Sequence, residues 1–334
     1  VILVTTFGDE LAIHTNKKAK VFGVSVKDRG AISMAGHAGK AFWFSKAAGE
    51  FITSEYYYDK YPEWVKAFNA AKPAQRYANQ SWDLMLEPSA YLHADDDDQA
   101  WEVALGAFGR VFPHEYGPAD GKYFTTFLTL SPAGDELTLD FAKQLIANES
   151  IGADDVTDYL SVSFSATDYV GHLFGPSSLE AEDNLLRLDR TLAKLFAYVD
   201  ETVGLKNTLI VLSADHGGPE VPPYLNEYGI DAGYVDTDSW DKQAGIQALK
   251  QKFGIGEELI SQYQQPYVYL NRAVIQEKGI DQAAVEAAVA EEMMKFEGVS
   301  LAVSSTALTR GQVADTDINR AILNSHNLKR SGDV

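Results

Sequence analysis

The chain has 334 residues, of which 46% are hydrophobic and 23% are charged. That length allows a large buried core and fits a single α/β domain carrying insertions. Its 48 acidic and 28 basic residues give a net charge of −20, which opposes binding to nucleic acid or to anionic lipid. Because there is no cysteine, disulfides and thiolate ligands are excluded, and imidazole and carboxylate groups remain as metal ligands.

No run of eighteen apolar residues occurs in the chain, so the sequence predicts no membrane-spanning helix. The first residues also lack the basic start and apolar stretch of a signal peptide. Oligomeric state cannot be read from these features and is left open.

The first predicted elements are a polar helix at 8–17 and a buried, valine-rich strand at 20–26. The strand is followed by Lys27-Asp28-Arg29 and by Gly30, which permits a sharp change of direction. We therefore expect two basic side chains at the carboxyl end of a strand, the edge at which open parallel sheets bind ligands. A solvated turn is the alternative interpretation of the tripeptide on its own.

Residues 40–125 are rich in aromatic side chains and interrupted by prolines, which predicts an inserted cap packed on the core. The four aspartates at 95–98 resemble a metal site, but adjacent carboxylates on a loop point in different directions. We interpret them as a solvated turn.

From residue 137 onward the pattern alternates between helix and strand. The predicted helices are at 138–149, 177–200 and 281–295, and the predicted strands are at 159–164, 207–213, 267–271 and 300–305. This order predicts an α/β fold with a mostly parallel central sheet flanked by helices.

Two of the predicted strands, 159–164 and 207–213, run into an acid and a histidine. Asp168 and His172 follow the first strand, four residues apart and so one helical turn from each other. Asp215 and His216 follow the second strand and precede two glycines that allow a kinked loop. Each histidine alone fits a structural role, but two such pairs at equivalent strand ends predict a cavity that binds two metal ions. Zinc, manganese and iron all suit these ligands.

The other histidines have no carboxylate at ligand spacing and are interpreted as structural: His14, His37, His93 and His114. His326, near the C-terminus, is kept in reserve as a further ligand.

Several stretches resemble the alkaline phosphatase superfamily, and within it the bacterial phosphate-irrepressible, type I phosphodiesterase-like alkaline phosphatases. They are VSVKDRGAI (24–32), SFSATDYVGHLFGP (163–176), EDNLLRLDRTLAKL (182–195), NTLIVLSADHGG (207–218) and KRSGDV (329–334). The resemblance runs from near the first residue to the last, and it implies one alkaline phosphatase-like α/β domain over 1–334.

The resemblance implies a role for each matching residue. An Asp and a His spaced like Asp168 and His172 bind one zinc in that family, and an Asp-His like Asp215-His216 binds the other. A Lys and an Arg placed like Lys27 and Arg29 contact the transferred phosphoryl oxygens and favour monoesters over diesters. An ammonium and an arginine fork suit the additional oxygen of a dianionic monoester.

The chain also departs from the family pattern. The first zinc-ligand Asp and the nucleophilic Thr of a Thr-x-Pro-x-His-like loop have no match, and the last zinc-ligand His would fall after KRSGDV. We therefore expect the nucleophile segment and some ligands of the two Zn²⁺ ions to lie outside this chain, which alone should be nearly inactive.

The expected activity of the complete protein is hydrolysis of small phosphate monoesters through a covalent phosphothreonine, in the periplasm or outside the cell. Two alternatives stay open: a phosphodiesterase or nucleotide pyrophosphatase with the same metals, and a non-catalytic metal- or phosphate-binding fragment. A sulfatase is disfavoured by the Lys-Asp-Arg match.

Overall fold

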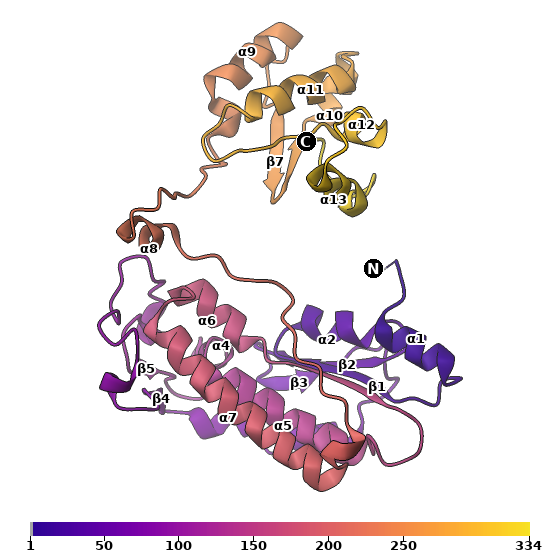
Figure 1. Ribbon diagram of the computed structural model, residues 1–334, viewed down its shortest axis with the longest axis vertical. Coiled ribbons are helices and arrows are strands. Elements are labelled where there is room, and N and C mark those ends of the chain that lie inside the picture. Colours follow the sequence, from indigo (N-terminus) through magenta and orange to yellow (C-terminus); the bar gives the residue numbers. More distant parts are fainter. Residues whose placement is uncertain (1–2) are drawn as a thin grey trace. The chain divides into compact units, whose positions relative to one another are not determined.

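The structure is a computed structural model that describes residues 3–334 (Figure 1). It consists of two compact units, Val1–Tyr224 and Leu225–Val334, each described here by itself. Every residue that the sequence places at the phosphoryl and metal sites lies in the first unit, apart from the reserve His326.

The first unit contains a central sheet, a small two-stranded antiparallel sheet and the longest helices of the described chain. Its helices are α1 (Phe7–His14), α2 (Asp28–Ala35), α3 (Glu63–Ala70), α4 (Phe124–Thr129), α5 (Pro132–Asn148), α6 (Ala166–Phe174) and α7 (Leu179–Thr202), with α8 (Pro222–Glu227) at the boundary. Its strands are β1 (Val21–Ser25), β2 (Lys40–Ser45), β3 (Glu50–Ile52), β4 (Ser81–Trp82), β5 (His114–Glu115) and β6 (Tyr159–Ser163). Short 3-10 turns are η1 (Pro73–Tyr77), η2 (Pro88–Ala90), η3 (Gly106–Phe108) and η4 (Leu205–Asn207).

The central sheet has the strand order β3-β2-β1-β6. Strand β1 pairs in parallel with β2 and with β6, and β3 closes the far edge as an antiparallel neighbour of β2. The predicted mostly parallel sheet flanked by helices is therefore confirmed. All five residues of β1 are buried, as its uninterrupted apolar pattern predicted for a central strand.

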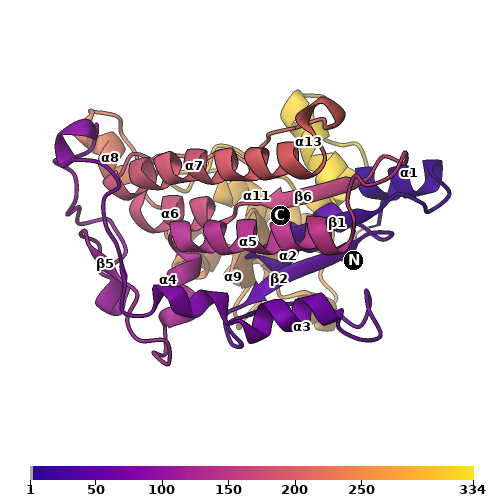
Figure 2. The same cartoon turned by 90° about the horizontal axis from the view of Figure 1, so that it is seen from below.

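Helices cover the two faces of this sheet in different ways. On one face α2 lies so close to β1 that a Cβ added at Gly23 would approach the Ala31 carbonyl oxygen to 2.2 Å. On the other face Phe42 and Phe51 pack against Phe141 of α5. Figure 2 shows α5 and α7 running side by side on that face. One face of the sheet thus packs against α2 through a close backbone contact, and the other packs against α5 through aromatic side chains.

The aromatic stretch at 40–125 contributes to the sheet as well as to its cover. Residues 40–52 form β2 and β3. In the segment beyond them, α3, η1 and the two-stranded β4–β5 sheet pack around the core. Its role as a cap over a substrate stays a prediction. Three of the four aspartates at 95–98 bond in divergent directions, since Asp96 contacts His93, Asp97 accepts from the Phe112 amide and Asp98 contacts Arg110.

The strand predicted at 207–213 is not formed in this structure. After η4 the chain has no helix or strand until α8, and Leu209, Val211 and Leu212 are 89%, 79% and 79% exposed. A strand needs a neighbour for its amide and carbonyl groups, and among the described residues β6 pairs only with β1. An apolar run by itself does not provide that partner.

The second unit is built around a two-stranded antiparallel hairpin rather than a parallel extension of the central sheet. Its elements are η5 (Trp240–Lys242), α9 (Ala244–Phe253), β7 (Ile260–Gln264), β8 (Tyr267–Leu270), α10 (Arg272–Glu277), α11 (Gln282–Met293), α12 (Ser305–Thr309) and α13 (Asp317–Ser325). The strand at 267–271 and the helix at 281–295 are confirmed. The strand predicted at 300–305 is wrong, because this stretch leads into α12 behind the N-cap Ser304, whose hydroxyl accepts from the Ala307 amide.

The C-terminal stretch KRSGDV docks onto this hairpin. Backbone hydrogen bonds join Val268 to Asp333 and Val334, and the fully buried Asp333 carboxylate accepts from the Leu270 amide and from Arg272. Among residues 3–334, none of the helices is both long and apolar enough to cross a bilayer.

Candidate active site

Lys27 and Arg29 lie where β1 ends and α2 begins. Lys27 is the N-cap residue of α2, and its amide donates to the Ser25 hydroxyl over 2.9 Å. Its side chain is 10% exposed and forms an ion pair with Asp168, whereas that of Arg29 is 72% exposed and its Nη1 lies 4.0 Å from Asp28. The structure therefore places both bases at the carboxyl end of a central strand, as predicted.

Asp168 and His172 are one turn apart on α6, the helix that follows β6. The Asp168 side chain is 21% exposed, and its Oδ1 lies 3.4 Å from His172 Nε2. Its other oxygen, Oδ2, faces the Lys27 ammonium. The spacing of four residues in the sequence is thus realised as an i, i+4 contact on a helix.

Asp215 and His216 lie in the segment without regular structure that precedes α8, yet they reach the same place. His216 Nε2 is 3.2 Å from Asp168 Oδ1 and 3.8 Å from Asp215 Oδ2. One carboxylate oxygen thus faces two imidazole nitrogens, from His172 and His216. Both predicted histidine ligands therefore contact Asp168, although one of the two supporting strands is absent, and Asp215 joins the cluster only through His216.

The charges of this cluster act on one another. Burial raises the pKa of the Asp168 carboxyl, but the hydrogen bond and charge of Lys27 outweigh it, and the net shift is downward. The Gly217 carbonyl and then the Asp215 carboxylate raise the pKa of the His216 imidazole. Among the residues that the structure describes, no three His, Asp or Glu side chains are arranged around a common point to hold a metal ion. The side chains of this cluster contact one another instead.

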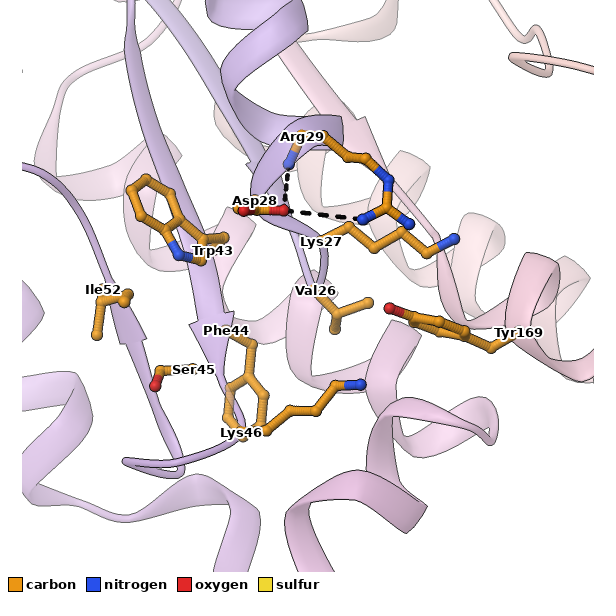
Figure 3. A pocket seen from close by; sticks show the side chains of 10 residues that line it. All are labelled: Val26, Lys27, Asp28, Arg29, Trp43, Phe44, Ser45, Lys46, Ile52 and Tyr169. Carbon is orange, nitrogen blue, oxygen red and sulfur yellow. Dashed lines mark hydrogen bonds and ion pairs between the residues drawn. The ribbon is translucent and has the colours of Figure 1, made fainter. Parts of the chain in front are cut away.

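A cavity of about 230 Å³ opens beside the cluster (Figure 3). Basic side chains line it together with aromatic and apolar ones: Val26, Lys27, Asp28, Arg29, Trp43, Phe44, Ser45, Lys46, Ile52 and Tyr169. The cavity is a local concentration of cations in a chain whose net charge is −20, so it favours an anionic ligand.

Comparison with known proteins places the chain in a family. The family model of type I phosphodiesterase / nucleotide pyrophosphatase matches residues 15–334. The chain belongs to this family. A crystal structure of wild-type alkaline phosphatase PafA superposes with a TM-score of 0.86 at 35% identity, covering 98% of this chain and 62% of that one.

Two curated relatives of similar identity to this chain carry different names. Alkaline phosphatase PafA of Elizabethkingia meningoseptica is 37% identical over 99% of this chain and 60% of its own length. A protein of Myroides odoratus named calcium-transporting ATPase is 36% identical over 100% of this chain and 61% of its own length. The chain thus spans about 60% of the length of these relatives.

Sequence reasoning missed the residues that hold α6 and the adjoining strand ends in place beneath Asp168 and Lys27 through hydrogen bonds. Asp135 of α5 accepts hydrogen bonds from the Ala166 amide over 3.0 Å and from the Thr167 hydroxyl over 3.3 Å, at the start of α6. Three serines at the strand ends form a hydrogen-bonded chain in which Ser165 Oγ lies 2.9 Å from Ser25 Oγ and 2.7 Å from Ser163 Oγ. Such pairings join residues far apart in the chain and leave no local signal.

Contrary to the expectation from sequence, two of the histidines interpreted as structural contact a carboxylate in the fold. His114 is fully buried between the Phe108 carbonyl and Glu180, and the His93 ring contacts Asp96. His326 lies in the second unit, as the C-cap residue of α13.

Proposed function

We propose that the complete protein hydrolyses small phosphate monoesters at the Asp168 cluster. The observation that carries this proposal is the convergence of two imidazoles and Lys27 on the single carboxylate of Asp168, beside a cationic cavity. Family membership supports it, and a relative over 99% of this chain is named alkaline phosphatase.

The donor set suits two zinc ions. Two imidazoles and two carboxylates without sulfur are ordinary zinc ligands. Each imidazole lies within 3.8 Å of a carboxylate oxygen, and His216 lies within that distance of both carboxylates. Asp168 and His172 would hold one ion, Asp215 and His216 the other, with further ligands from outside residues 1–334. Bound zinc supplies Lewis acidity, which lowers the pKa of a nucleophilic hydroxyl and stabilises the leaving oxygen.

The side chains of this chain would bind and orient the phosphoryl group. Arg29 is exposed at the cavity with its guanidinium turned away from the core, so its fork can engage two phosphoryl oxygens. Lys27, nearly enclosed and already beside Asp168, places a second positive charge between the metal ligands and the substrate. In the proposed reaction the hydroxyl of a threonine outside this chain attacks phosphorus and displaces the alcohol of the ester, and water then hydrolyses the phosphothreonine to free threonine and inorganic phosphate.

A second candidate is a phosphodiesterase or nucleotide pyrophosphatase activity at the same residues. Trp43, Phe44 and Ile52 give the cavity an apolar side that could contact a second ester group. Arg29 opposes this alternative, because a diester has fewer charged oxygens for it to bind. A fragment that only binds metal or phosphate is the remaining alternative for this chain taken alone. The resemblance to exported phosphatases supports a periplasmic or secreted location.

The test is elemental analysis of the purified full-length protein, together with assays on an aryl phosphate monoester, a diester and a sulfate. We expect two zinc ions per protein and preferential turnover of the monoester. Preferred turnover of the diester would establish the second candidate instead. A full-length protein without metal and without turnover would refute both.

A further inference from the structure

A third cationic side chain faces the cavity, in addition to Lys27 and Arg29. Lys46 lies in the turn between β2 and β3, and its ammonium is 4.9 Å from the centroid of the Tyr169 ring. The turn is tied down through its backbone, because the Thr125 hydroxyl donates to the Lys46 carbonyl over 2.7 Å. The side chain of Lys46 can therefore be changed without removing the hydrogen bond that holds the turn.

Lys46 differs from Lys27 in having no acidic partner. Lys27 is paired with Asp168, but among residues 3–334 no carboxylate lies within ion-pair distance of the Lys46 ammonium. With 48 acidic residues in the chain, an unpaired ammonium aimed into a cavity is available for an anion from outside.

Tyr169 separates the two lysines. The Lys27 ammonium lies 4.1 Å from the same ring centroid, and Figure 3 shows the ring between the two lysine side chains. Both contacts are of the cation–π type, which holds each ammonium against a ring rather than in bulk water. Tyr169 follows Asp168 directly on α6, so the ring that separates the two lysines is carried by the same helix as the predicted metal ligands Asp168 and His172.

We infer that Lys46 is a specificity-determining residue that binds a second anionic group on the leaving group of the substrate. The inference rests on the proposed function, in which Lys27 and Arg29 hold the phosphoryl group on the other side of Tyr169. The preferred substrates are then monoesters of alcohols or phenols that also carry a carboxylate or a second phosphate. A single phosphoryl group held at Lys27 and Arg29 does not need the third cation.

The experiment uses the full-length protein and three esters: phenyl phosphate, 3-carboxyphenyl phosphate and its neutral analogue 3-carbamoylphenyl phosphate. The measured quantity is the ratio of kcat/KM for the carboxy ester to that for the carbamoyl ester at low ionic strength. We expect wild-type protein to favour the carboxy ester by about two- to fivefold, the range of a partly exposed ion pair. Added salt should reduce the preference.

Lys46→Gln should remove this preference, and Lys46→Glu should reverse it. The matched control is Lys206→Gln, which removes the same charge from an exposed lysine beyond the far end of α7. An unchanged ratio in Lys46→Gln, with all three esters still hydrolysed, would overturn this inference alone. No turnover of any ester by wild-type protein would overturn the proposed function and the inference with it.

Discussion

Lys27 and Arg29 are two residues apart, yet their environments suit different tasks. The Lys27 ammonium is nearly enclosed and neutralised by Asp168, while the guanidinium of Arg29 is 72% exposed and only 4.0 Å from the similarly exposed Asp28. Removing Lys27 would take the ammonium away from the Asp168 carboxylate and disturb the metal ligands. Arg29 can be removed with little effect on the fold, so it is the better probe of substrate recognition.

Arg29→Ala should lower kcat/KM for an aryl phosphate monoester about tenfold more than for a diester. The reason is that a monoester dianion offers the fork an extra charged oxygen, and a hydrogen bond between charged groups contributes on the order of 1.5–3 kcal/mol. Steady-state kinetics of the full-length protein measure both constants, with Arg29→Lys as the variant that keeps the charge and loses the fork. Equal losses on the two esters would remove the discriminating role of Arg29.

At the scale of elements, the site depends on how α6 is anchored. Asp135 of α5 accepts hydrogen bonds from Ala166 and Thr167 at the start of α6, directly before Asp168 and about one turn before His172. A carboxylate at this position also interacts favourably with the positive end of the helix dipole. Burial nevertheless raises the pKa of Asp135 to about 7, so its charge grows as the pH becomes alkaline.

Asp135→Ala should weaken zinc binding by the full-length protein about 10- to 100-fold, as losses of supporting residues behind metal ligands do. It also leaves the buried Ala166 amide unpaired, which costs about 1–3 kcal/mol of folding free energy. Chelator competition at pH 8.5 measures the affinity. Asp140→Ala on the same helix is the control, because Asp140 is partly exposed and pairs with Arg76 outside the site. Equal zinc affinities in the two variants would show that Asp135 does not position α6.

At the scale of the whole molecule, the first unit buries several acids away from the site. Glu180, at the start of α7, is fully buried and contacts His114 Nε2 over 3.1 Å. Since His114 Nδ1 faces the Phe108 carbonyl and must carry a proton, Nε2 of the neutral ring accepts from a protonated Glu180. Burial raises the pKa of Glu180 to about 8 and lowers that of His114. Burial also raises the pKa of Glu102 to about 8.

This arrangement makes stability depend on pH. The folded pKa of Glu180 is raised above its usual value of 4.5, so between about pH 4.5 and 8 the folded state binds more protons than the unfolded state. The contribution of Glu180 to the free energy of unfolding therefore falls as the pH rises through this window and levels off above pH 8.

Glu180→Gln should reduce the fall in the free energy of unfolding between acidic and alkaline pH by on the order of a few kcal/mol. The reason is that the amide of Gln donates to His114 at any pH, as the protonated carboxyl does. Denaturant unfolding of the full chain from pH 5 to pH 9 measures the effect as a difference between wild type and variant. Glu201→Gln, at an exposed position on α7, is the control. Parallel curves for wild type and Glu180→Gln would show that Glu180 is charged when folded.

Much of this molecule follows from local sequence. The valine-rich run before Lys27 predicts a buried strand, the spacing of Asp168 and His172 predicts one face of a helix, and the 3.6-residue period predicts the amphipathic helix α7. These features depend on residues within a turn or two of one another, so their physical cause is present in the chain itself.

Only the tertiary structure decided which distant residues meet. His216 contacts Asp168 from a segment that forms no strand, and the ammonium groups of Lys46 and Lys27 both lie near the Tyr169 ring. Asp135 of α5 accepts a hydrogen bond from the first residue of α6. The tertiary structure also left the apolar residues at 209–212 exposed, because a strand requires a hydrogen-bonding neighbour that hydrophobicity does not supply. Contacts between side chains far apart in sequence depend on how helices and strands pack, and packing is a property of the whole fold.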